Sequence, residues 1–398
     1  MLLGRPKVSS QWLARLEKVV EQTSADPPAD LAAVIREELK VDLTARYAGI
    51  EIPHPIGKAS GQLSFTRQQV ATSLDAGIGF VVLKTVIAED SDGSRSMEEW
   101  STGETHMSVE RRTASDGLDG WTVTWFGRGW AGTLEDYVEF FSDVMRLPNH
   151  RGVPIVPSVK YNLPDDPSEV LEDEYCFTTS RLLEVWKEVG CGGPMLLEKD
   201  FSPTLAGDPR ALSRDRILRW VENVTDWVHE AATEEIRLGV KLMNTMFDDD
   251  FQTEMVRQIS ETDPAFLVVF NRLFDPKAGV AFGGWELSSR NLRVLDLVRA
   301  VDVHTPPLSG TGNICTGRVM LEYALRGCEN GQVHTFFQVP QTEYLATGGS
   351  RIARALHTLL LHPRDGLVVW LQNLHESGMV EARNGEIRFL DVVGLRST

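Results

Sequence analysis

Residues 238–270 read LGVKLMNTMFDDDFQTEMVRQISETDPAFLVVF and contain the repeating unit from which we predict the fold. Leu238–Leu242 and Phe266–Phe270 are short apolar runs bounded by polar residues, which is typical of buried strands. Between them, Asp249–Ile259 places apolar residues at helical spacing. Two buried strands joined by an amphipathic helix indicate a parallel sheet that is covered on both faces.

The same alternation extends along the chain in both directions. Strands are predicted at 56–60, 79–86, 153–159, 195–198, 238–242, 266–270, 301–303 and 332–336. Helices are predicted at 66–76, 134–145, 178–189, 214–232, 249–259, 290–298, 318–326 and 350–361, with a further one at 366–377. Eight strands that each precede a helix match an α/β fold of the (β/α)8 TIM-barrel class better than an open doubly wound sheet.

A short N-terminal helical extension is predicted for residues 1–43. Within it, residues 10–23 and 29–40 have apolar positions at helical spacing. These helices either dock on the body of the protein or touch a membrane. Docking is favoured, because helices that lie on membranes usually carry more Lys and Arg on their polar face.

The barrel itself is predicted for residues 44–378, and it begins with a hairpin at 44–56. A β-rich insertion at about 87–130 would cover the mouth formed by the carboxyl ends of the strands. Residues 379–398 are predicted to form a small C-terminal hairpin tail, which turns at Asn384-Gly385.

The composition excludes several classes of partner. The chain has 398 residues, and 40 Lys and Arg against 57 Asp and Glu give a formal charge of −17. So acidic a surface argues against nucleic acid or a membrane face as the main partner. Because no apolar run could span a bilayer and no signal-peptide core is present, we expect a cytoplasmic protein with no integral membrane segment. Four irregularly spaced cysteines favour reduced thiols over a disulfide framework or a metal site.

Two features of the strand ends carry the functional prediction. The glycine-rich loop Gly310–Gly317 leads into a helix, and a turn around Thr335 follows the last strand. Loops after strands seven and eight of such a barrel are the usual phosphate site, although a plain loop remains an alternative. Lysines such as Lys84 and Lys241 also lie at strand ends. A lysine in a barrel mouth needs an anionic or electron-rich partner, and a flavin ring is one such partner.

Several short motifs follow one another in a fixed order: GKASG at 57–61, GIGF at 77–80, LKT at 83–85, VKL at 240–242, FN at 270–271, GG at 283–284 and GTGNICTG at 310–317. A further matching segment runs from Gly327 to Thr335. This ordered set covers roughly residues 44–375 and resembles the dihydroorotate dehydrogenase family of FMN enzymes. The resemblance implies a barrel with FMN across its mouth, and barrels of this family often form homodimers.

The resemblance also implies specific roles for residues of this chain. FMN would contact Ala59, Ser60, Gly61, Lys84, Thr85, Ser158, Lys241, Asn271, Gly284, Gly310, Gly312, Asn313, His334 and Thr335. Lys241 would lie beside the N1/O2 edge of the flavin and serve as a catalytic residue. Ser202 matches the family's catalytic base, which removes a proton from the substrate while hydride leaves to flavin N5. The alternative for Ser202 is an ordinary turn serine before proline.

The chain departs from the family at the positions that hold the orotate ring. Where the family has asparagines, this sequence has Thr124, Lys199 and Thr204, and it keeps Asn271 alone. Arg128 and Arg272 replace a phenylalanine and a threonine of the family. We take the substrate-binding residues to be Thr124, Arg128, Lys199, Thr204, Asn271 and Arg272. Three cations among them favour a small anionic substrate other than dihydroorotate.

Three hypotheses for function remain open at this stage. The first is an FMN-dependent oxidoreductase that transfers hydride between flavin N5 and a C–C or C–N bond next to a carbonyl or carboxylate. The second is a divergent true dihydroorotate dehydrogenase of pyrimidine synthesis. The third is a barrel without redox chemistry that binds a ligand. Apart from these hypotheses, the alternative for the cations of the site is that they pair within the protein, with Asp200, Glu198 or the acidic residues Glu98, Glu99 and Glu104.

Overall fold

The computed structural model describes residues 5–98, 101, 106–113, 119–126, 129–149, 152–201, 213–232, 235–275, 280–284 and 287–395. Its α-helices are α1 Ser10–Ser24, α2 Leu31–Leu39, α3 Arg67–Asp75, α4 Leu134–Met145, α5 Glu172–Glu188, α6 Arg214–Ala232, α7 Asp249–Glu261, α8 Leu287–Ala300, α9 Gly317–Leu325, α10 Arg351–Leu361 and α11 Leu367–Glu376. Its strands are β1 Val41–Asp42, β2 Ala45–Tyr47, β3 Ile50–Ile52, β4 Ile56–Lys58, β5 Val81–Val82, β6 Val86–Ile87, β7 His106–Thr113, β8 Asp119–Phe126, β9 Ile155–Val156, β10 Ser158–Lys160, β11 Met195–Phe201, β12 Ile236–Met243, β13 Phe266–Asn271, β14 Leu273–Asp275, β15 Val280–Gly284, β16 Leu308–Thr311, β17 Cys328–Val333 and β18 Ile387–Arg388.

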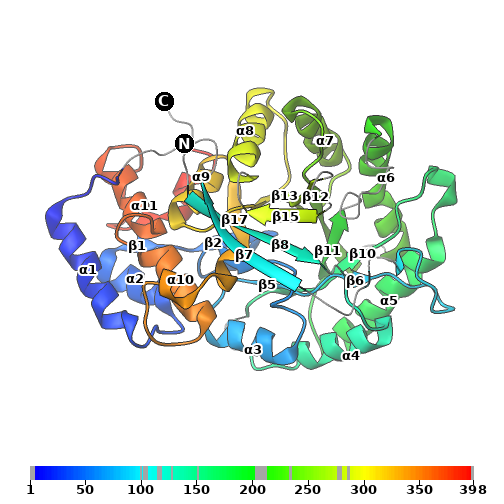
Figure 1. Ribbon diagram of the computed structural model, residues 1–398, viewed down its shortest axis with the longest axis horizontal. Coiled ribbons are helices and arrows are strands. Elements are labelled where there is room, and N and C mark those ends of the chain that lie inside the picture. Colours follow the sequence, from blue (N-terminus) through cyan, green and yellow to red (C-terminus); the bar gives the residue numbers. More distant parts are fainter. Residues whose placement is uncertain are drawn as a thin grey trace.

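In this part of the chain, ten strands form one parallel sheet in the order β6-β10-β11-β12-β13-β16-β17-β4-β5-β9. The sheet curls, and helices α3 to α8 follow one another in an arc around it (Figure 1). Every residue of β11 is buried, as expected for a strand that is covered on both faces. The α/β barrel-like architecture confirms the coarse prediction from the alternating pattern.

The sheet is not the ring of eight unbroken strands that the sequence predicts. The segment expected as one strand at 79–86 contains β5 and β6, and the next one contains β9 and β10. Pro157 lies between β9 and β10, and proline has no N–H to donate to a ladder. The predicted strands 79–86 and 153–159 are therefore each replaced by a pair of short strands.

The prediction of the seventh strand, at residues 301–303, is wrong. Residues 301–303 form no strand: Val301 is 60% exposed, and Asp302 has the positive φ of a turn. The strand at this place in the sheet is β16, which contains Ser309 and Gly310. The eighth strand, β17, also begins earlier than the predicted 332–336 and ends at Val333.

The N-terminal helices dock on the body of the protein. Trp12, Leu16 and Val19 of α1 are buried in the hydrophobic core. The Thr23 Oγ1 and His357 Nε2 atoms lie 2.8 Å apart and join α1 to α10. Just before the start of α1, the backbone N–H of Ser9 donates to a Glu376 carboxylate oxygen at 2.7 Å. Docking is thus the alternative that the structure supports, and Figure 1 shows α1 and α2 packed beside α10 and α11.

The predicted hairpin at 44–56 is present as β2 and β3, which pair antiparallel on either side of Ala48-Gly49. Tyr47 of β2 stacks on Phe80, with ring centroids 4.0 Å apart, and also meets Phe266 at 5.1 Å. All three rings are buried, so the hairpin packs against the inner core of the curled sheet. At the other end of the chain, Arg383 and Glu386 bridge across the predicted Asn384-Gly385 turn, and β18 pairs in parallel with β1.

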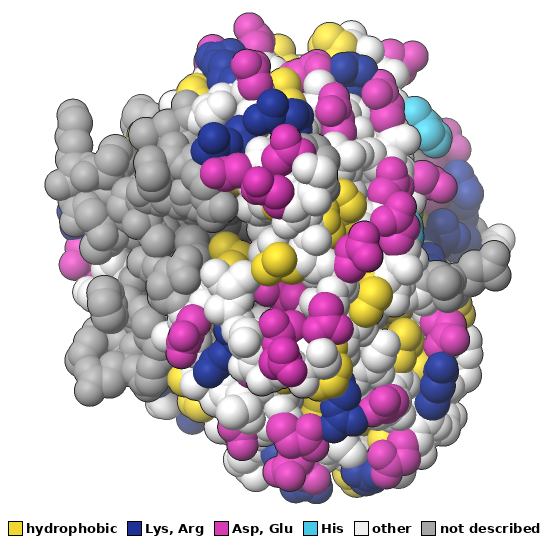
Figure 2. Space-filling model, turned by 90° about the vertical axis from the view of Figure 1, so that its right-hand side faces the viewer, with side chains coloured by type: hydrophobic (Ala, Val, Ile, Leu, Met, Phe, Trp, Pro, Cys, Tyr) yellow, Lys and Arg dark blue, Asp and Glu magenta, His cyan; other side chains and the backbone are white. Residues whose placement is uncertain are grey.

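The outer surface mixes charges of both signs. Figure 2 shows acidic side chains spread over one face of the molecule, with Lys and Arg side chains among them. None of the helices in the described ranges is long and apolar enough to cross a membrane.

Candidate functional site

A pocket opens beside the carboxyl ends of the parallel strands and contains about 960 Å³ of empty space, part of which is open to solvent. Its walls come from segments that follow β4, β5, β13, β16 and β17 and from residues within β10, β11, β12 and β15. Of the predicted site residues, it is lined by Ala59, Ser60, Gly61, Lys84, Thr85, Lys241, Asn271, Arg272, Gly284, Gly312, Asn313, His334 and Thr335.

Four of the predicted residues do not line the pocket: Ser158, Gly310, Thr124 and Lys199. Ser158 is buried and forms a hydrogen bond with the pocket residue Thr85. Gly310, which we expected in a loop, belongs to β16 and packs against Tyr323. Thr124 lies in β8, in a separate antiparallel sheet. Ser202, Thr204 and Arg128 lie outside the described residues.

Lys199 and Asp200 show why strand alternation decides the lining of the pocket. Successive side chains of a strand point to opposite faces, so only one of these neighbours can face inward. Asp200 lines the pocket, and the fully buried Lys199 donates from Nζ to the carbonyl oxygen of Tyr161 at 3.0 Å. Burial lowers the pKa of Lys199 to about 7. The expected cation is therefore replaced in the pocket by a carboxylate.

Cations surround Asp200 on the pocket wall. In the sheet, Asp200 pairs with Lys241 of β12. On the other side, Val159 pairs with Lys199, so the next residues, Lys160 and Asp200, are also neighbours. Lys160 and Lys241 both line the pocket, with exposures of only 3% and 4%. Side chains at positions 160, 200 and 241 thus form a row across three adjacent strands.

Lys84 and Arg272 add further positive charge to this side of the pocket. Burial and, to a smaller extent, Arg272 lower the pKa of Lys84 to about 7, although Asp200 acts in the opposite direction. The Asn271 amide nitrogen, Nδ2, donates to Asp200 Oδ1 at 3.3 Å and so links the end of β13 to the end of β11. We call Lys84, Lys160, Lys241, Arg272 and Asp200 the cationic wall.

A buried network of hydrogen bonds and an ion pair holds the Lys241 side chain in place beneath the pocket. Its Nζ donates to Gln332 Oε1 at 3.0 Å and lies 3.6 Å from Glu198 Oε1. The Gln332 amide in turn donates from Nε2 to Glu198 Oε2 at 2.6 Å. Burial raises the pKa of the fully buried Glu198 carboxyl, and Lys241 counteracts this shift. Lys241 is thereby held in one position with its charge partly balanced.

A chain of hydroxyl groups connects the pocket to the carboxylate of Glu198. Ser60 Oγ lies 2.9 Å from Thr85 Oγ1, which lies 3.0 Å from Ser158 Oγ. Ser158 donates to Glu198 Oε1 over a longer distance of 3.5 Å. The predicted cofactor residue Ser158 therefore acts on the pocket through Thr85 and not by contact.

Glycines form another part of the pocket lining. Gly284 and Gly312 have φ values of 99° and 110°, which residues other than glycine rarely adopt. A Cβ on Gly284 would lie 1.9 Å from the carbonyl oxygen of Trp121, and one on Gly312 would lie 2.7 Å from Asn291 Nδ2. We call Gly283, Gly284, Gly312, Asn313 and Thr335 the glycine wall. At Gly284 and Gly312, neighbouring protein atoms and the backbone conformation both exclude a side chain.

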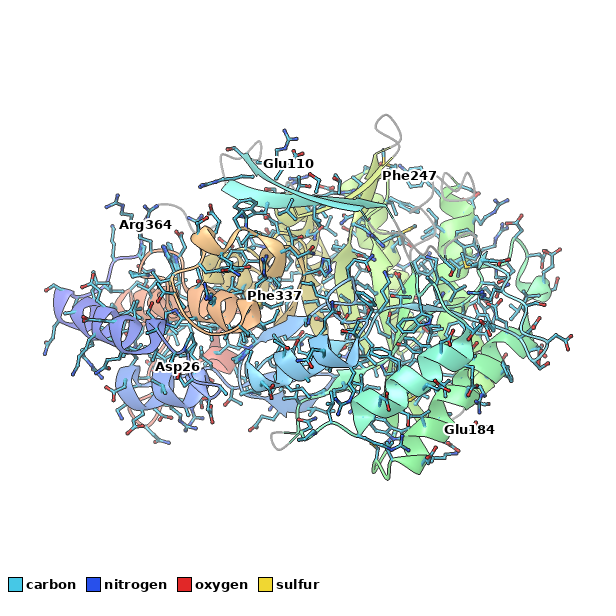
Figure 3. All side chains as sticks on the ribbon, turned by 60° about the horizontal axis from the view of Figure 1, so that its bottom comes forward. Asp26, Glu110, Glu184, Phe247, Phe337 and Arg364 are labelled. Atoms are coloured by element: carbon cyan, nitrogen blue, oxygen red, sulfur yellow. The ribbon has the colours of Figure 1, made fainter. Side chains whose placement is uncertain are left out.

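A second sheet lies over the glycine wall. Strands β14, β15, β8 and β7 form an antiparallel sheet, and Thr122 of β8 donates to the carbonyl oxygen of Gly283 at 3.3 Å. The insertion was expected to be β-rich, but its pairing with β14 and β15 was not predicted. Figure 3 shows this sheet at the outer edge of the molecule, with Glu110 of β7 on the side away from Phe337.

Asn313 joins this second sheet to the pocket. Its Oδ1 accepts from the Trp121 N–H at 3.4 Å, and its Nδ2 donates to Ser288 Oγ at 3.1 Å. Asn313 also has a positive φ of 53° and lines the pocket. Its side chain therefore holds β8 against α8, while its backbone faces the pocket.

His334 is half-buried and lies against Gly61, where an added Cβ would come 2.3 Å from His334 Nε2. Burial lowers the pKa of His334 to about 3, with a further contribution from Lys84 and Arg272. The imidazole is therefore neutral at ordinary pH and adds no positive charge to the pocket.

The sequence reasoning missed several residues that line the pocket, among them Gln62, Lys160, Asp200, Cys315 and Gln332. The alternation of β10 and β11 contains the missing signal for two of them. If Ser158 and Glu198 face the interior, then Lys160 and Asp200, two residues later, must do so as well. Among the residues described, no cluster of His, Cys, Asp or Glu is arranged to hold a metal ion.

Comparison of the chain with protein-family models and with curated protein sequences found no match.

Proposed function

We propose that the protein is an FMN-dependent oxidoreductase that acts on a C–C or C–N bond next to a carbonyl or carboxylate in a small anionic molecule. The observation that carries the proposal is the pocket itself. It brings lysines, an arginine and bare glycine backbone together in one pocket at the carboxyl ends of the parallel strands. In barrels of this kind, catalytic residues and phosphate sites are built from the loops at that face.

The residues present are compatible with FMN. The glycine wall lines the pocket, and it would be the part that receives the phosphate or ribityl chain of FMN. The cationic wall matches a ring that gains negative charge on reduction. Bound FMN would supply the two-electron redox chemistry, for which no side chain of the protein is suited.

Lys241 would contribute a fixed positive charge to this chemistry. Its Nζ is held by Gln332 and Glu198, so it does not have to reorganise when negative charge develops beside it. The Ser60 and Thr85 hydroxyls would provide hydrogen-bonding groups in the pocket, and Ser158 holds Thr85 from behind. Ser202 remains the residue that we propose to accept a proton from the substrate.

We also propose that the curled sheet acts as a closed (β/α)8 barrel. β5 pairs with β9 and β6 pairs with β10, while β17 pairs with β4 on the other side. Residues 83–85 alone separate β5 from β6, and Pro157 alone separates β9 from β10. Counting each broken pair as one strand gives eight strands that all have two neighbours, which supports a rigid mouth for the site.

The test is to identify what the purified protein binds. We expect a flavin spectrum and FMN by mass spectrometry, or recovery of that spectrum after the apoprotein is incubated with FMN. Gly312→Ala should lower FMN affinity at least tenfold, because its Cβ would crowd Asn291. Gly378→Ala is the matched control: it also has positive φ, but an added Cβ meets nothing within 4 Å.

A protein that neither contains FMN nor takes it up would overturn the proposed function and favour a ligand-binding barrel without redox chemistry. The second enzymatic alternative is tested by mixing dihydroorotate with the flavin-loaded protein under anaerobic conditions. We expect no bleaching of the flavin absorbance. Rapid bleaching would instead identify a divergent dihydroorotate dehydrogenase.

A further inference from the structure

Three buried, uncharged polar side chains adjoin the glycine wall without lining the pocket: Asn244, Asn291 and Tyr323. Asn244 follows β12, and the other two belong to α8 and α9. All three are completely excluded from solvent, with exposures of 0%. Polar groups in such a place destabilise the fold unless they are hydrogen-bonded, so their partners show what the three side chains hold. We call these three residues the Asn–Tyr network.

Asn291 is the centre of the network. Its Nδ2 has two hydrogens and donates to the carbonyl oxygen of Thr311 at 2.7 Å and to the Tyr323 hydroxyl at 3.0 Å. Its Oδ1 accepts from Asn244 Nδ2 at 3.2 Å. Exchanging the two ends of the amide would bring donor against donor at Asn244 and acceptor against acceptor at Thr311. The orientation of the Asn291 side chain is therefore fixed by its partners.

The network ends on backbone carbonyl groups at the carboxyl ends of adjacent strands. Asn244 Nδ2 also donates to the carbonyl oxygen of Asn271, the last residue of β13, at 2.7 Å. The Tyr323 hydroxyl lies 2.9 Å from the carbonyl oxygens of both Thr311 and Gly312, and it can donate its one hydrogen to either. The last paired residues of β13 and β16 come before these positions. The network thus fixes the backbone where the ladder between these two strands stops.

The direction of these carbonyl groups decides where the neighbouring N–H groups point. In a trans peptide unit, the C=O bond and the following N–H bond point in opposite directions, and the peptide units at 311–313 are trans. The carbonyl groups of Thr311 and Gly312 point toward the network. The N–H groups of Gly312 and Asn313, which belong to the same peptide units, therefore point away from it. Gly312 and Asn313 line the pocket, and within the described part of the chain neither N–H has a protein acceptor.

We infer that Asn291 is a positioning residue of the ligand site, which turns the N–H groups of Gly312 and Asn313 toward an anionic oxygen of the ligand. Successive backbone N–H groups whose own carbonyls are engaged elsewhere are suited to bind an anion. In FMN this anion is the phosphate. The inference rests on the glycine wall receiving that phosphate in the proposed function, and it adds the side chains that orient the wall.

The experiment compares the affinities of FMN and riboflavin for the flavin-free protein, measured by quenching of flavin fluorescence. Riboflavin has the same ring and side chain as FMN but no phosphate. We expect the unaltered protein to bind FMN about tenfold more tightly than riboflavin, or better, because hydrogen bonds to charged groups are strong. Asn291→Leu keeps a similar volume without the amide. It should weaken FMN binding by about tenfold and riboflavin binding by less than about twofold.

A purely structural role for Asn291 would give a different result. A general distortion of the pocket should weaken both flavins by the same factor, and that outcome would overturn the inference. Unchanged FMN affinity in Asn291→Leu would overturn it as well.

Tyr323→Phe tests the network by a smaller change, in case Asn291→Leu does not fold. It removes one hydroxyl, keeps the ring that packs against Gly310, and should weaken FMN binding more than riboflavin binding. Tyr175→Phe is the matched control, because Tyr175 is also a buried tyrosine whose hydroxyl donates to a backbone carbonyl, that of Asn162, at 2.6 Å. Tyr175 belongs to α5, and Asn162 does not line the pocket. This control should leave both affinities unchanged, and equal effects of the two tyrosine variants would contradict the inference.

Failure of this inference can be told apart from failure of the proposed function. If the unaltered protein binds FMN and riboflavin equally well, the flavin function stands and the inference falls. If it binds neither flavin, the redox function falls, and calorimetry with inorganic phosphate tests the inference alone. Phosphate should then bind to the unaltered protein, and about tenfold more weakly to Asn291→Leu. No binding of phosphate, or equal binding to both proteins, would overturn the inference.

Discussion

The two walls of the pocket recognise ligands by different physical means. The glycine wall depends on absent side chains: Gly284 and Gly312 have positive φ, and an added Cβ at either would collide with neighbouring atoms. The cationic wall depends on charges that are almost completely buried, as at Lys160 and Lys241. The first wall should therefore be sensitive to added atoms, and the second should be sensitive to lost charges.

The largest effect is expected from Lys241→Met on the cationic wall. The change leaves the buried Glu198 carboxylate without its cation, and breaking a buried ion pair in this way typically costs about 3–5 kcal/mol. We expect the free energy of unfolding, measured by urea denaturation, to fall by about that amount at neutral pH.

A double variant separates charge from packing at this position. Adding Glu198→Gln to Lys241→Met removes both charges, and replacing both partners of a buried pair is often close to neutral. The double variant should recover most of the lost stability. If it is as unstable as Lys241→Met alone, the ion pair is not what Lys241 contributes.

A smaller loss is expected from Gly284→Ala on the glycine wall. The new Cβ would meet the Trp121 carbonyl oxygen at 1.9 Å and would require φ near 99°, so the backbone must shift at a cost of about 3 kcal/mol. Thermal unfolding should show this loss. Gly385→Ala is the control, because Gly385 has positive φ but open space around it. Its free energy of unfolding should fall by about 1 kcal/mol, from backbone conformation alone.

The smallest effect is expected behind the glycine wall. The Thr316 hydroxyl accepts from the Val319 N–H at 3.2 Å and caps α9. Thr316→Ala should cost about 1 kcal/mol of stability by denaturation, the usual value for a lost N-cap. FMN affinity should stay unchanged, because Thr316 does not line the pocket. A large loss of FMN affinity would extend the ligand site to the start of this helix.

Most of the fold could be predicted because periodicity reports burial directly. The helices at 134–145 and 214–232 coincide with α4 and α6, whose apolar residues are strongly periodic. The failure at 301–303 has a physical cause. Three apolar residues resemble a strand, but the true strand Leu308–Thr311 is built of small residues that pack beneath Tyr323. Such a strand carries almost no hydrophobic signal.

The site was harder to predict because it depends on register. A shift of one residue exchanges the two faces of a strand, and this is the difference between Lys199 and Asp200. The glycines and Lys84 could be placed from motifs that surround them. The pairing of β8 with β15 joins segments about 160 residues apart, as Thr122 and Gly283 illustrate, and no local pattern encodes such a contact.

The parallel pairing of Val41 with Ile387 has a consequence for synthesis of the chain. The partner of β1 is made almost 350 residues later, and so are Asn373 and Glu376, which receive hydrogen bonds from the segment before α1. At translation rates of about 5–20 residues per second, the apolar faces of α1 and α2 wait on the order of tens of seconds for their docking site. During that interval Trp12 and Leu16 are exposed on the nascent chain and accessible to chaperones at the ribosome.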